Sequence, residues 1–122
     1  MKSFADLPVY RETYQASLAI MTKIVPYLTG EGSEEMIKRL SNIATSIPRL
    51  IAGAVAVPQD RQGKKACAAE AIRGCHEAMV MLSHCRDLYP QRVNSNLCRE
   101  LIDIYGRSSA HLVEAADKRR KT

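Results

Sequence analysis

Apolar residues recur every three or four positions in four separate stretches of the sequence, and this spacing is the strongest constraint on the fold. Such a repeat lines one side of an α-helix with apolar side chains, and that side must be buried against other helices. The stretches predict helices near residues 8–28, 33–57, 60–87 and 95–118. No stretch shows the period-two alternation of a strand. We therefore expect an all-α protein, an antiparallel up-down-up-down four-helix bundle.

Pro48 lies inside the second predicted helix. A proline within a helix removes one backbone hydrogen bond and clashes with the preceding turn, at a cost of roughly 3 kcal/mol. The apolar repeat nevertheless keeps its phase from Met36 through Pro48 to Val57. It predicts one helix with a kink at Pro48, held in place by neighbouring helices.

The predicted helices are preceded by residues that favour helix starts. Asp and Ser side chains accept hydrogen bonds from the first free N–H groups of a helix. We expect Asp6, Ser33 and Asp60 to cap the first three helices, and either Asn94 or Ser95 to cap the fourth. The first helix is expected to bury the face formed by Leu7, Tyr10, Tyr14, Ser17, Leu18, Met21, Ile24, Val25 and Leu28.

Length and composition predict one domain over residues 1–122, ending in a short basic tail. With one Phe and no Trp, the core must consist mainly of aliphatic side chains. The N-terminal residues show no signal-peptide pattern, and no stretch is long and apolar enough to span a membrane. These features predict a cytoplasmic protein without a membrane contact.

The residues that most often carry catalysis or bind metal show no suitable spacing. The four cysteines, at 67, 75, 85 and 98, form no close pair, and the three histidines form no metal-binding pattern. No glycine-rich phosphate loop is present. We expect a non-catalytic protein without metal or cofactor, whose cysteines are reduced thiols in the helix core.

A net charge of +5 raises the question of an acidic partner. Basic residues cluster at the start of the third predicted helix and in the C-terminal tail. Such clusters are either a solvated surface or a site for phosphates. The residues that we expect to bind nucleic acid are Arg61, Lys64, Lys65, Lys118, Arg119, Arg120 and Lys121.

Small residues are frequent in the third and fourth predicted helices. The set consists of Ala66, Ala68, Ala69, Ala71, Gly74, Gly106, Ser108, Ser109 and Ala110. They allow helices to approach closely, either inside one bundle or between subunits. Because they cover more than one face, they suit contacts between subunits, but the residues alone leave both uses open.

Four stretches resemble, in order, a bacterial four-helix-bundle family. FADLPVY at 4–10 resembles its F-x-D-L-x-V-W/Y opening, and SIP at 46–48 resembles a segment of its second helix. AIRGC at 71–75 is similar to an A-x-G-S segment, with Cys75 in place of serine. Residues 102–121 resemble the closing helix, where Gly106 and Arg107 match a G-R step. Leu50 stands where the family usually has Asn.

This family includes proteins encoded in intervening sequences of 23S ribosomal RNA genes. It also includes accessory variability determinant proteins of diversity-generating retroelements. The resemblance implies a homopentamer around a central channel and, for the retroelement members, binding to nucleic acid and a reverse transcriptase.

Charge and resemblance together predict an oligomeric scaffold that binds nucleic acid, RNA or a ribonucleoprotein. The alternative is a protein–protein interaction module that does not bind nucleic acid directly.

Overall fold

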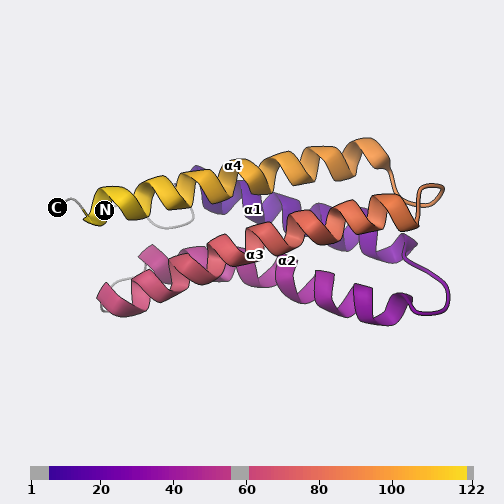
Figure 1. The fold of residues 1–122 in the computed structure, drawn as a ribbon, viewed down its shortest axis with the longest axis horizontal. Coiled ribbons are helices and arrows are strands. Elements are labelled where there is room, and N and C mark those ends of the chain that lie inside the picture. The colour runs from indigo at the N-terminus through magenta and orange to yellow at the C-terminus, as the bar shows by residue number, and fades with distance from the viewer. Residues whose placement is uncertain (1–5, 56–60, 121–122) are drawn as a thin grey trace.

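The computed structural model describes residues 6–55 and 61–120, with the backbone alone for residues 61 and 117–120. It contains four long helical segments: α1 (Pro8–Ala19), continued by η2 (Ile20–Ile24) and η3 (Val25–Tyr27), then α2 (Ser33–Val55), α3 (Arg61–Leu88) and α4 (Ser95–Arg120). Successive segments run in opposite directions, so the connections 28–32 and 89–94 share one end of the molecule (Figure 1). Each helix packs against two neighbours, in the cyclic order α1, α2, α3, α4. The predicted all-α four-helix bundle is confirmed.

The first helical segment is less regular than predicted. After Ala19 the chain forms a π-helix and then a short 3₁₀-helix. Pro26 has no N–H, so the regular ladder of α-helical hydrogen bonds cannot continue through it. The prediction of Asp6 as the cap was wrong, because the N-cap position is Leu7 and carries no side-chain hydrogen bond.

The second helix passes through Pro48 without ending, as predicted. Pro48 itself is buried. Ser33, predicted as the cap of this helix, is instead its first residue, and its hydroxyl donates to the Gly30 carbonyl over 2.7 Å, so it fixes the preceding turn. Gly30 and Gly32 in that turn have φ values of +111° and +85°, a backbone region that favours glycine.

The structure decides between the two caps considered for the fourth helix. The Asn94 side-chain oxygen accepts the N–H of Leu97 at 3.0 Å, which makes Asn94 the cap of α4. Asp60, predicted to cap α3, lies outside the described residues.

Residues from all four helices form the hydrophobic core. It is largely aliphatic, as the composition predicted, with one aromatic side chain and three cysteines at its centre. The largest fully buried side chains are Tyr105, Ile20, Ile24, Leu28, Leu40, Ile47, Ile51, Leu82 and Leu101.

The buried face of α1 and η2 differs in part from the predicted one: Ser17, Ile24 and Leu28 are buried as predicted, but other members of the face are not. Tyr14, Leu18 and Met21 are 45%, 45% and 36% exposed, although the apolar repeat placed them in the core. The core is instead contacted by a neighbouring stripe that includes polar Thr13, whose hydroxyl donates to the Val9 carbonyl at 2.9 Å. This internal hydrogen bond allows a polar residue to be buried at little cost. The buried stripe is Val9, Thr13, Ala16, Ser17, Ile20, Ile24 and Leu28.

Many of the small residues in α3 and α4 serve close packing inside the bundle. A Cβ atom at Gly74 would lie 3.0 Å from Cγ1 of Ile47 on α2. A Cβ atom at Gly106 would lie 3.4 Å from Cε of Met79 on α3. Ala71 is fully buried as well. The exposed members of the set are Ala66, Ala69 and Ala110, so the small residues alone do not favour assembly between subunits.

We predict that side chains added at Gly106 and at Gly74 have opposite effects on the free energy of unfolding. Gly106→Ala should raise the free energy of unfolding by about 0.5–1 kcal/mol, because alanine favours the helix and the new methyl group meets only the flexible end of Met79. Gly74→Val should lower it by about 1–3 kcal/mol, because Ile47 must move. Urea denaturation at pH 7 measures both. A destabilising Gly106→Ala variant would contradict this packing.

Candidate nucleic-acid interface

The register between α3 and α4 determines where the predicted phosphate-binding residues lie. Nε2 of His76 and Oγ of Ser109 are 2.7 Å apart, and Gly106 faces Met79 in the same antiparallel register. Extending this register toward the start of α3 brings Lys65 level with Arg120. The start of α3 and the end of α4 therefore lie at the same end of the bundle, opposite the connections 28–32 and 89–94, although the two helices diverge toward this end (Figure 1).

We call this end the basic end and define it by Arg61, Lys64 and Lys65 of α3 with Lys118, Arg119 and Arg120 of α4. Lys65 is exposed and Lys64 is half-buried. The other four are placed by their helical backbone. The seventh predicted residue, Lys121, lies outside the described residues. The topology thus places at one end two basic segments that are far apart in the sequence.

The net charge of the chain comes from the two segments that form or border this end. Residues 61–65 and 114–122 contain seven basic and two acidic residues, whereas the remaining sequence has eleven of each. The excess of +5 is therefore concentrated in 14 of the 122 residues. Such concentration is what phosphate binding needs, since a basic patch acts through its local density of charge.

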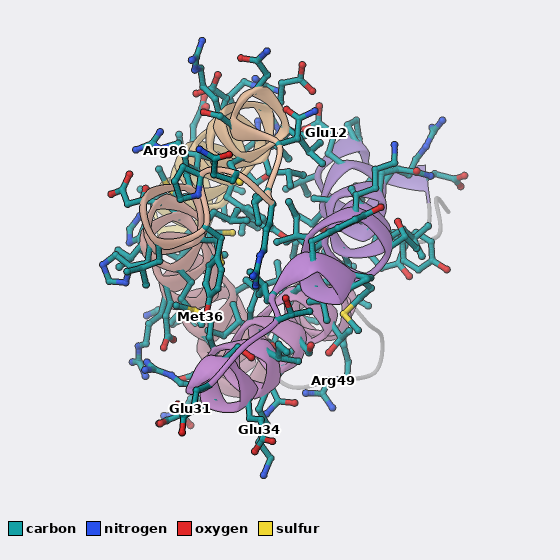
Figure 2. All side chains as sticks on the ribbon, turned by 90° about the vertical axis from the view of Figure 1, so that its right-hand side faces the viewer. Glu12, Glu31, Glu34, Met36, Arg49 and Arg86 are labelled. Carbon is teal, nitrogen blue, oxygen red and sulfur yellow. The ribbon has the colours of Figure 1, made fainter. Side chains whose placement is uncertain are left out.

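The opposite end of the bundle carries charges of both signs. Figure 2 views this end, where Glu31 and Glu34 extend outward from the turn before α2 and from its first residues. Glu35 and Asp87 are exposed there as well. A basic residue of the connections, Arg92, donates to the carbonyl and hydroxyl oxygens of Thr29. Nε of Arg86 lies 3.5 Å from Oδ1 of Asp87 at this end, so acidic and basic side chains are mixed here and no excess of positive charge builds up.

Along the sides of the bundle, several arginines are paired with carboxylates. The N–O distances are 3.2 Å for Arg39–Glu77, 3.1 Å for Arg73–Glu70 and 3.9 Å for Arg107–Glu12. By contrast, neither Lys64 nor Lys65 forms an ion pair with another described residue. Lys64 and Lys65 therefore have no described carboxylate that competes with a ligand for their charge.

The buried cysteines are poor candidates for nucleophiles or metal ligands. Cys75, Cys85 and Cys98 are fully buried, whereas Cys67 is half-buried. Burial raises the pKa of Cys75 to about 12 and contributes most to raising that of Cys85 to about 11, so both are neutral thiols at pH 7. Among the described residues, no group of three or more His, Cys, Asp and Glu side chains is arranged to hold a metal ion.

Sequence reasoning missed two local features. One is the contact between His76 and Ser109, which are 33 residues apart and gave no signal in the sequence. The other is an open hollow of about 470 Å³ on the outer side of α2, lined by Asn42, Ile43, Thr45, Ser46 and Arg49. All five lining residues belong to one helix. The hollow is therefore too open to enclose a small molecule.

The fold defines the class of this protein as a four-helix bundle, and its basic residues are concentrated at one end. None of the known protein families, curated proteins or solved structures compared with the chain matches it. Within residues 6–55 and 61–120, no helix combines the length and the apolar character needed to cross a bilayer.

Because the thiols of Cys75 and Cys85 are buried, we predict that the folded protein loses stability in alkaline solution. Their pKa is ordinarily 9.0 and is raised in the folded protein, so between pH 9 and about pH 11 the unfolded chain releases protons that the native protein retains. The contribution of these thiols to the free energy of unfolding is fully present below pH 9. It decreases as pH rises above 9, by about 1.4 kcal/mol per pH unit for each thiol. We expect urea denaturation under reducing conditions to show a lower free energy of unfolding at pH 10 than at pH 8.

The variant Cys75→Ala serves as the control for this effect. It lacks one of the titrating groups and should reduce the difference between the two pH values, whatever its own stability at pH 8. An unchanged pH dependence in Cys75→Ala would contradict the assignment.

Proposed function

We propose that the protein is a non-catalytic oligomeric scaffold that binds nucleic acid, RNA or a ribonucleoprotein, through the basic end. The observation that carries the proposal is the presence of two basic segments at one end of the bundle, with all the excess positive charge in and beside them. Lys and Arg side chains there pair with phosphates and release counterions. Such contacts position a nucleic acid without reading its sequence.

Assembly would strengthen this binding. In the homopentamer implied by the family resemblance, five chains would carry about +25, and weak phosphate contacts on linked sites add up through their effective concentration. A reverse transcriptase as a further partner rests on the same resemblance. The proposal therefore includes a ring as the working form.

Light scattering tests the assembly. At micromolar concentration we expect a mass several times the 13.6 kDa of one chain, with five copies as the leading expectation. A mass of 13.6 kDa would refute the ring and leave binding to the basic end of a single bundle.

A protein–protein interaction module is the second candidate function. The observation that favours it is the run of exposed apolar side chains along the first helix, at Tyr14, Leu18 and Met21. Exposed apolar groups of this kind mark contacts with other proteins. The affinity for such a partner protein would change little with salt concentration.

Charge reversal separates the two candidates. The charge-reversal variant combines Lys64→Glu, Lys65→Glu, Arg119→Glu and Arg120→Glu. It should bind structured RNA and duplex DNA at least about tenfold more weakly than the wild type at low salt. The slope of log affinity against log salt should become shallower by about one for each phosphate that the variant no longer binds. Fluorescence anisotropy across a salt series measures both quantities.

The chain offers a matched control. The control variant combines Lys23→Glu, Lys38→Glu, Arg49→Glu and Arg99→Glu. It replaces the same two residue types and alters the net charge by the same amount, but at positions outside the basic end. The control variant should bind structured RNA and duplex DNA clearly more tightly than the charge-reversal variant of the basic end. Equal weakening by both variants would show that only net charge matters, and absence of binding by the wild type at low salt would favour the protein-interaction module.

A further inference from the structure

Two tyrosine rings are stacked on the outer side of α1. The centroids of Tyr10 and Tyr14 are 6.0 Å apart and their planes differ by 21°. Tyr10 is half-buried and packs against the hydrophobic core, whereas Tyr14 is 45% exposed. The anchored ring of Tyr10 thus supports an exposed ring whose orientation is largely fixed before any ligand binds.

The side of α1 that carries Tyr14 is free of acidic residues. Arg11, three residues before Tyr14, shares its side of the helix, is exposed and forms no ion pair among the described residues. The single carboxylate of α1, Glu12, is directed toward Arg107 of α4 at 3.9 Å. An exposed aromatic ring beside a positive charge is the combination that single-strand binding proteins use, because bases stack on the ring while phosphates meet the cation.

The helix register connects this ring to the basic end. α1 begins at the end of the bundle where α4 finishes, and the Glu12–Arg107 pair sets these two antiparallel helices against each other. Tyr14 is therefore level with Tyr105, and the basic residues at the end of α4 lie about 20 Å further along the axis. A strand of several nucleotides can cover both places.

Building on the proposed function, we propose that the nucleic acid is single-stranded and that Tyr14 stacks on one of its bases while the basic end holds its phosphates. A duplex hides the faces of its bases inside the stack, so only an unpaired strand can use the ring. This revises the expectation that Tyr14 belongs to the buried face of the first helix.

Tyr27 provides the matched control for Tyr14. It is 53% exposed and precedes the acidic turn at the other end of the bundle. Tyr14→Ala and Tyr27→Ala therefore remove the same side chain from exposed positions near opposite ends of the first helical segment. A third variant, Tyr14→Phe, keeps the ring and removes only the hydroxyl group.

The test is a titration with an unstructured single-stranded RNA, long enough to cover both places, and with the corresponding duplex, both at low salt. Tyr14→Ala should bind the single strand at least about fivefold more weakly, whereas its affinity for the duplex should not change. Tyr14→Phe and Tyr27→Ala should bind the single strand like the wild type. Circular dichroism and light scattering confirm that fold and mass are unaltered.

The outcomes separate this inference from the function on which it rests. If Tyr14→Ala binds the single strand like the wild type while the charge-reversal variant does not bind, the stacking role is wrong and phosphate binding stands. An equal loss for single strand and duplex, or a changed mass with unchanged affinity, assigns Tyr14 to a protein contact and also overturns the inference. If the wild type binds neither probe, both proposals fail.

Discussion

The close packing of α3 against α2 and α4 is the interaction on which the rest of the molecule depends. Gly74 brings the backbone of α3 against Ile47, and Gly106 brings that of α4 against Met79. A side chain at Gly74 would press against Ile47, whereas one at Gly106 would meet Met79 at ordinary contact distance, and this packing fixes how far each helix slides along the next. The same register brings the start of α3 level with the end of α4. The charge distribution is thus a consequence of how the core packs.

The sequence was sufficient to predict the number, order and approximate limits of the helices, because four long apolar repeats leave few other ways to bury their surface. It also predicted that the second helix continues through Pro48. It failed where two apolar stripes lie side by side on one helix. The stripe of Tyr14, Leu18 and Met21 is more hydrophobic than the stripe of Thr13, Ala16 and Ser17, yet the second is the buried one. The available space and the satisfied hydroxyl of Thr13 decided this, and neither is visible in the sequence.

The same limit applies to the candidate site. Clusters of Lys and Arg are visible in a sequence, and the seven residues were chosen on that basis. Whether two clusters that are far apart in the chain share a surface depends on topology and register, which the structure supplies for residues 61–65 and 118–120. The exposure of Tyr14 and its stacking on Tyr10 could not be predicted either, since both follow from the rotation of α1 against the core.

The position of the basic residues on α3 is unfavourable for the helix itself. A helix start carries a partial positive charge, so acidic residues stabilise it and basic residues oppose it, each by about 0.3–1 kcal/mol when exposed. α2 follows this rule, with Glu34 and Glu35 in its first turn. α3 has no acidic residue in its first turn, and Arg61, Lys64 and Lys65 lie in its first five positions. A ligand that brings phosphates to the start of α3 would relieve this repulsion and benefit from the positive helix end.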